Sequence, residues 1–354
     1  MIVAFSLSGL PKFARSWLRV KSLKGQIMDI NEIFSSGFDS ETLTVSINAA
    51  PFAPGLLASR KLYREVPMAT TSAVIELIDE VLRLVQSSPR GAPADIHRAA
   101  TRRIVEFATA RLLTQQTIHA DSWQNKRGFG TGALASIEAE RDRYLAEMRR
   151  RLEASIEFHR TRALAGVVLD ADGSVMLDLL AEFGVSQNTQ SMALGSPTTN
   201  VRNQIIAAKR KSEIELGSMR PKSWLAVCSA SFFDALTAHP SVAATVEGWD
   251  AATVLRDDVR ADFGFANVQF VEVRNSANVT WIEADTAYLV PEGVPDLFLT
   301  HYAPADYMET ANTMAQPLYA KAEIGSMGRS IRIESQTNPV SFCTKPRAVV
   351  KLTA

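Results

Sequence analysis

The feature that most constrains the fold is an apolar stripe of helical period between Gly132 and Gly166. Its members recur at intervals of three, four and seven residues, which places them on one face of an α-helix: Leu134, Ile137, Tyr144, Leu145, Met148, Leu152, Ile156 and His159. Charged side chains fill the other faces of this helix. The two glycines flank a helix of about 30 residues, which spans roughly 45 Å. A helix of that length suits a structural strut better than a compact enzyme domain.

Hairpins are predicted before and after this helix. The segments Thr70–Val85 and Arg102–Leu112 surround a stretch rich in Pro and Gly, Gln86–Asp95, and together they predict one long hairpin. After the helix, Gly166–Leu180 consists of two apolar runs around Asp170–Gly173. That pattern predicts a second, shorter hairpin with its turn at the DADG sequence.

The second half of the chain predicts helices and short strands in an irregular order. Ser196–Met219 predicts a helix with Thr199 or Asn200 as its N-cap. Trp224–Trp249 predicts a strand followed by two short helices divided at Pro240. Short strands are expected further along: residues 267–273, residues 287–293 and several between Leu297 and Ala354. This order predicts an α+β fold with a mixed sheet, because it is not a regular series of parallel βαβ units.

Composition limits the classes of function. The chain has 354 residues, enough for two or three domains. Lys and Arg number 38 and so do Asp and Glu, so the formal net charge is zero and sequence-independent DNA binding is not expected to be the main role. The chain contains no run of 18 apolar residues, so no membrane span is predicted. The two cysteines, Cys228 and Cys343, lie far apart and are expected to be free buried thiols.

The N-terminal residues differ from the rest of the chain. Residues 1–27 contain five basic residues and no acid, and a second possible start follows at Met28. They are expected to be either an artefact of an upstream start or a basic arm. From Met28 to Val66 the pattern predicts an extended arm with a short helix, interrupted by prolines that favour extended backbone before them.

Two motifs resemble enzyme or metal sites, but the residues around them do not fit such sites. The GFGTG sequence at Gly128–Gly132 follows a polar segment and not a strand, so a flexible entry to the long helix is preferred to a dinucleotide loop. Asp170–Gly173 begins like a calcium loop, but Val175 and Ala181 stand where an EF-hand needs Gly and Glu. No catalytic, cofactor-binding or metal-binding residue is therefore predicted.

Several other residues have a structural interpretation. His159 lies on the stripe and is expected to be a packed core residue, whereas His119 and Asp121 are expected on the surface or in a loop. The basic run Arg149–Arg151 alternates with acids, which predicts a solvated helix face. The pair Phe232–Phe233 is expected in the core or at an interface between subunits.

Three segments, in the same order along the chain, resemble the phage major capsid protein E family, the lambda-type head proteins. They are MDINEIFSSGFDSETLTVSINAAPFAPGLLA (Met28–Ala58), EFHRTRALAGVVLDADGSVMLDLLAEFGV (Glu157–Val185) and GVPDLFLTHYAPADYMETANTMAQPLYAK (Gly293–Lys321). The resemblance covers about Met28 to Ala354 and implies the Hong Kong 97-type capsid fold. Carried over, it divides the chain as follows: 1–27 a basic extension, 28–69 an N-arm, 70–112 an E-loop hairpin, 113–195 a peripheral domain with spine helix 132–166, 196–291 an axial domain, and 292–354 a return to the peripheral domain.

The resemblance implies a structural protein and not an enzyme. The expected function is that of the major capsid protein of a tailed double-stranded DNA phage or prophage, which assembles in the bacterial host cytoplasm into hexamers and pentamers of an icosahedral shell. It has no expected cofactor or membrane partner, and it encloses DNA without sequence-specific binding. The expected partners are other copies of the chain, a scaffolding protein and a portal, with a decoration protein as an optional further partner. The alternatives are a cellular nanocompartment shell of the same fold and, less favoured, an α+β enzyme.

The tip of the long hairpin is the expected contact between subunits. It protrudes too far to bury itself, and its flanks carry apolar residues that need a partner surface: Val81, Leu84, Ile104 and Phe107. Arg90, Gly91 and Pro93 at the tip are the predicted inter-subunit residues.

Overall fold

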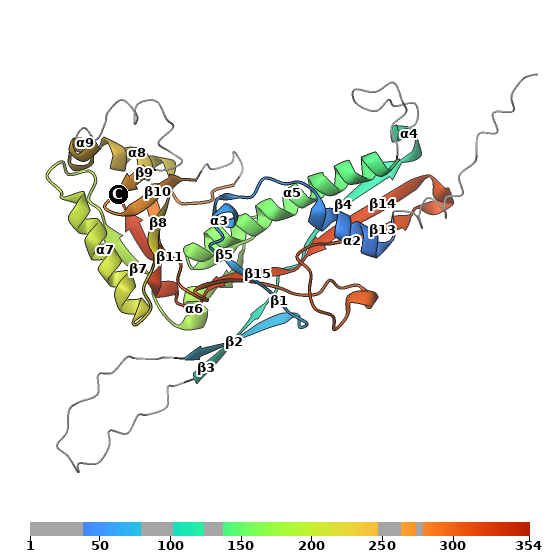
Figure 1. Cartoon of the computed structure of the whole chain (residues 1–354), viewed down its shortest axis with the longest axis horizontal. Coiled ribbons are helices and arrows are strands. Elements are labelled where there is room, and N and C mark those ends of the chain that lie inside the picture. Colours follow the sequence, from blue (N-terminus) through green and yellow to red (C-terminus); the bar gives the residue numbers. More distant parts are fainter. Residues whose placement is uncertain (1–37, 79–101, 124–136, 247–262, 274–278) are drawn as a thin grey trace, which may run out of the picture.

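The computed structural model describes residues 38–78, 102–123, 137–246, 263–273 and 279–354. One long helix, α5 (Ile137–Leu164), runs obliquely through the molecule (Figure 1). A lobe of helices around a sheet lies at the C-terminal end of α5, and an elongated sheet lies along its N-terminal half. Among the described residues, no helix is both long and apolar enough to span a membrane.

Helix α5 confirms the predicted strut. It has 28 residues, about 42 Å at 1.5 Å per residue, and it ends two residues before Gly166, whose φ is +82°. The predicted start at Gly132 lies outside the described residues. In the N-terminal half only the stripe is buried, but from Ile156 to Leu164 every residue is buried. The helix therefore enters the protein interior as it proceeds.

The described part of the N-terminal arm contains two helices where one was predicted. Helix α2 (Ser40–Ala49) is capped by Asp39, whose carboxylate accepts the N–H of Thr42, and α3 (Leu56–Ser59) follows a proline-rich link. Strand β1 (Arg64–Pro67) then pairs in parallel with β12 (Phe298–Tyr302), which pairs with β15 (Pro339–Cys343). Segments far apart in sequence thus meet beside α5 (Figure 1).

The strands of both predicted hairpins pair as expected, although the tip of the first hairpin lies outside the described residues. Strand β2 (Ser72–Ile78) pairs antiparallel with β3 (Arg102–Ala108), and β5 (Val167–Leu169) pairs with β6 (Val175–Asp178). The short helix α6 (Leu179–Phe183) follows β6. A three-stranded sheet of order β13-β14-β4 flanks α5. Its strands and the short helix that follows β4 have these bounds: β4 Leu112–His119, α4 Ala120–Trp123, β13 Tyr319–Ile324 and β14 Ser330–Thr337.

The lobe is built on a mixed six-stranded sheet of order β7-β16-β11-β8-β10-β9. Its strands and helices have these bounds: β7 Asn188–Ser191, α7 Val201–Leu216, β8 Ser223–Cys228, α8 Ala230–Ala238, α9 Pro240–Val246, β9 Phe263–Phe265, β10 Val268–Glu272, β11 Thr286–Glu292 and β16 Val350–Thr353. Helix α7 starts after Asn200, which caps it through the N–H of Asn203, and α9 starts at Pro240 as predicted. Strands β7 and β16 lie outside the segment 196–291, and both belong to this sheet.

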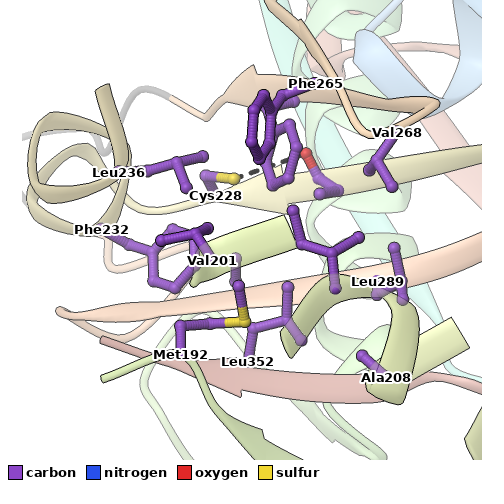
Figure 2. Packing of buried hydrophobic residues seen from close by; sticks show 14 of the residues in the cluster. Met192, Val201, Ala208, Cys228, Phe232, Leu236, Phe265, Val268, Leu289 and Leu352 are labelled. Atoms are coloured by element: carbon purple, nitrogen blue, oxygen red, sulfur yellow. Dashed lines mark hydrogen bonds between the residues drawn. The ribbon is translucent and has the colours of Figure 1, made fainter. Parts of the chain in front are cut away.

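The core of the lobe joins residues from most of these elements. Figure 2 shows Met192 and Leu352 beside Leu289 and Val201, with Phe232 packed nearby. Phe232 and Phe233 are fully or almost fully buried, which settles their predicted role as core residues of the lobe. Both cysteines are free and buried, as predicted.

Replacing Met148 by proline is expected to abolish soluble expression. Met148 is 2% exposed in the middle of α5, where proline removes a helical hydrogen bond at a cost of about 3 kcal/mol or more. The lost side-chain packing adds roughly 2–5 kcal/mol. Soluble yield and circular dichroism measure the effect. The control Met148→Leu conserves volume and should express normally; a normal yield of Met148→Pro would contradict the assigned role of α5.

Candidate assembly surface

The inner face of the β2–β3 hairpin packs within its own subunit. Ala73 lies opposite Phe107 and Ile75 opposite Val105, so these residues share one face of the two-stranded sheet. Phe107 is 1% exposed, and its ring centroid lies 5.3 Å from that of Phe342. The prediction that Phe107 needs a partner surface outside the subunit is therefore wrong, because the alternation of the strand turns it inward.

The outer face of the same hairpin is exposed and carries both apolar and acidic residues. Val74 is 59% exposed and Ile104 is 66% exposed. Val74 on β2 lies opposite Glu106 on β3, so these two residues share one face of the hairpin. Ile104 lies two residues before Glu106 on β3 and is therefore on the same face. A two-stranded hairpin is marginally stable alone, and exposed apolar side chains such as Val74 and Ile104 mark a site where another surface can bind. Ile104 is exposed within the subunit, and its contact with a partner surface stays a prediction.

The hairpin strands extend away from the body, below it in Figure 1. The predicted contact residues Arg90, Gly91 and Pro93, and the flanks Val81 and Leu84, lie outside the described residues. Other exposed apolar side chains occur elsewhere on the surface, and they are Val45, Leu113, Val175, Met176, Ile214, Met308, Met314 and Met327.

Helix α5 contacts the N-terminal arm at several places, and the first is the C-terminal end of α2. Nη1 of Arg149 donates hydrogen bonds to the carbonyl oxygens of Ile47, Asn48 and Ala50, at 3.0, 2.5 and 2.6 Å. The guanidinium also lies 4.1 Å from the ring centroid of Phe52. A cation at this position neutralises the partial negative charge of the last helical carbonyls. The prediction of a solvated basic face is right for Arg150 and Arg151, which are exposed, and wrong for Arg149.

The second attachment lies at the start of α3. The Glu157 carboxylate accepts the N–H of Leu57 at 2.5 Å and that of Ala58 at 3.3 Å. Gly55 is required here, because a Cβ at this position would overlap the Glu157 carboxylate. Glu157 therefore supplies the acceptor that the first turn of α3 lacks.

The next charged residue of α5 joins the arm to β12. Arg160, 3% exposed, donates to Glu65 at 2.8 Å and to the hydroxyl of Thr300 at 3.1 Å. The Tyr63 hydroxyl donates to the Arg160 carbonyl at 2.8 Å. A buried guanidinium needs such a full set of partners, since an unpaired one costs several kcal/mol. Glu65 is therefore a β1 residue whose position depends on α5.

The sequence interpretation missed Arg149, Glu157 and Arg160. A stripe assigns charged residues of a long helix to solvent, and all three lie off the stripe. The available signal was the Gly55 region, where a proline-rich link precedes a very short helix without a side-chain cap of its own. Such a helix needs an acceptor from elsewhere.

The remaining candidate residues have structural positions. His159 is 4% exposed, as predicted for a core residue, and burial lowers its pKa. His119 ends β4 and Asp121 lies in α4, and both are exposed as predicted. Asp172 accepts the N–H of Ser174 at 2.8 Å within the predicted hairpin turn. The GFGTG segment lies outside the described residues.

The described residues offer little for catalysis or metal binding. Among them, no group of three or more His, Cys, Asp or Glu side chains could hold a metal ion. A surface hollow beside β8 and β10 is lined by residues without an ionisable side chain: Ser223, Trp224, Gly264, Asn267, Val268 and Gln269.

Comparison with solved structures defines the class of fold. The putative capsid protein of a prophage of E. coli CFT073 superposes with a TM-score of 0.53 at 12% identity, over 89% of this chain and 98% of that one. The capsid of Ralstonia phage GP4 gives a TM-score of 0.50 at 10% identity, over 83% of this chain and 87% of that one. The fold is therefore the Hong Kong 97-type capsid fold, as the sequence resemblance implied.

Sequence comparison then gives the family. The model of phage major capsid protein E matches residues 39–354, so the chain belongs to that family. The major capsid protein of Pseudomonas phage KPP10 is 26% identical over 89% of this chain and 97% of its own length. The major capsid protein of Salmonella phage Felix O1 is 25% identical over 90% of this chain and 97% of its own length. The chain is a structural protein of a phage capsid and not an enzyme, which confirms the favoured interpretation.

Replacing Arg149 by alanine is expected to lower the free energy of unfolding by about 2–3 kcal/mol, since hydrogen bonds from a charged donor to three carbonyls are lost. The neighbouring exposed Arg150→Ala is the matched control and should change it by less than about 0.5 kcal/mol. Urea denaturation of the unassembled chain measures both variants. Equal effects of the two substitutions would contradict the role assigned to Arg149.

Proposed function

We propose that this chain closes into hexamers and pentamers that form an icosahedral shell around double-stranded DNA. The observation that supports it best is the β2–β3 hairpin, which extends from the body with Val74 and Ile104 exposed on its outer face. Burying that face on another copy removes apolar surface from water at roughly 25 cal/mol per Å². Contacts of this head-to-tail kind generate rings when the rotation closes.

Within this proposal the segments have different roles. The hairpin 70–112 reaches the neighbouring copy, and Arg90, Gly91 and Pro93 at its tip make the inter-subunit contact. The lobe with the six-stranded sheet faces the centre of the capsomer. The arm, α5 and the β13-β14-β4 sheet form the outer part of each subunit. Each contact can be weak, because many act together in a closed shell.

Further partners belong to the same proposal. The shell assembles in the cytoplasm of the bacterial host with a scaffolding protein and a portal, and a decoration protein is an optional further partner. The balance of 38 basic and 38 acidic residues agrees with a wall that encloses DNA without reading its sequence.

Replacing Ile104 by lysine is expected to reduce particle yield at least tenfold and to leave the melting temperature of the unassembled chain nearly unchanged. The side chain is exposed in the subunit, so a charge costs little there, but it must lose its water when this face is buried on another copy. Electron microscopy and sedimentation measure the yield. Ile104→Val is the control and should assemble normally. A normal yield of Ile104→Lys particles would exclude this face from the interface.

Deleting Ser87–Ala94 tests the tip itself. The subunit should fold with an unchanged melting temperature, whereas the yield of capsomers should fall, because the tip contacts another copy. Parallel measurement of melting and particle yield separates the two effects. An equal loss in both would mean that the tip packs within its own subunit, and an unchanged yield would remove the tip from the interface.

A further inference from the structure

The contact between the arm and α5 contains more acids than bases. Three carboxylates, those of Glu65, Glu153 and Glu157, lie near the guanidinium groups of Arg149 and Arg160. Arg149 lies 3.7 Å from Glu153, and Arg160 lies 2.8 Å from Glu65. Three negative and two positive charges leave one negative charge in excess, and Glu157 is the carboxylate without an ion pair of its own among the described residues.

Glu157 can be hydrated only if the arm moves. The residue is 6% exposed, Gly55 lies directly against its carboxylate, and the N–H groups of Leu57 and Ala58 point at its oxygens. When α3 lifts from α5, water reaches the carboxylate and these hydrogen bonds are lost. The protonation of Glu157 is therefore coupled to the position of the arm.

The surroundings of Glu157 decide the sign of this coupling. The titratable and charged groups that face it or its neighbour Glu153 come from α5, β1, β12 and the arm, and they are Arg149, Glu153, Arg160, Glu65, Tyr302 and Tyr63. The tyrosines stay neutral, because burial raises the pKa of both hydroxyls. Uptake of one proton therefore brings the site to neutrality.

We propose that the contact between Glu157 and α3 is a proton-dependent latch, which holds the N-terminal arm more tightly on α5 when Glu157 or Glu153 takes up a proton. A protonated carboxyl group keeps a carbonyl oxygen that can accept the Leu57 N–H, so the hydrogen bond to α3 persists. Protonation removes the charge that burial makes unfavourable. This inference concerns one subunit and stands independently of the proposed shell.

The direction of the pKa shifts agrees with this latch. Burial raises the pKa of Glu157 and that of Glu153, and hydrogen bonds and nearby arginines only partly oppose it. A carboxyl group whose pKa is raised in the held state favours that state when protonated. The hold is therefore fully present below the ordinary carboxyl pKa and weakens as the pH rises through the raised pKa.

Hydrogen exchange of the full chain tests the latch. The observable is the protection factor of a peptide that covers residues 51–62, normalised to the intrinsic exchange rate at each pH. In the unsubstituted protein, protection should rise between pH 7.5 and pH 5, by up to about tenfold for each unit by which the pKa is raised in the held state. A flat profile, or a fall in protection on acidification, would overturn the proposal.

Substitutions separate the latch from ordinary packing. Glu157→Gln should give high protection at both pH values, because the amide oxygen still accepts the N–H and no charge is buried. Glu157→Ala should lower protection about tenfold or more at both, and Glu153→Gln should reduce the pH dependence. Glu147→Gln, at a partly exposed residue of α5 whose carboxylate pairs with Arg151, is the control and should keep the full pH dependence. Unaltered pH dependence in Glu157→Gln would overturn the proposal even if its fold, checked by circular dichroism, were intact.

Discussion

The burial of α5 is the constraint on which the other parts of the structure depend. Its apolar residues belong to four of the five hydrophobic clusters, since Leu145, Ile156, Ala163 and Leu164 each lie in a different one. The helix joins the elongated sheet, the root of the hairpin and the lobe through these contacts. A packed interior transmits a displacement rather than absorbing it. A shift of α5 therefore moves the hairpin and the lobe together, and this rigidity suits a subunit whose contacts must repeat accurately.

Local signals along the chain were sufficient for much of this fold. The stripe predicted α5, and the turn residues predicted both hairpins. The cap candidates Thr199 and Asn200 marked the start of α7, and Pro240 marked that of α9. These features depend on residues a few positions apart, so periodicity and capping rules detect them. The resemblance to known capsid proteins supplied the fold class, which local patterns left at α+β with a mixed sheet.

The remaining features depend on contacts between distant segments. Arg149 and Glu157 look like surface charges until the arm, about 100 residues earlier, is placed over them. Helix α3 is too short for an apolar period, and it is stabilised by a carboxylate from another helix. For the same reason β7 and β16 could not be assigned to the lobe from their own sequences, because four-residue strands show where a strand lies but not which sheet it joins. Which strands pair is decided by the tertiary packing of the whole subunit.

The position of β16 has a consequence for the order of folding during synthesis. It is the last described strand along the chain, and it lies between β7 and β11 inside the six-stranded sheet. Until Val350–Thr353 emerge from the ribosome, β7 has no strand partner in this sheet, and the core of the lobe lacks Val350 and Leu352. Such long-range pairing forms late, because the chain must close a large loop first. The lobe is therefore completed only when translation of this segment is complete.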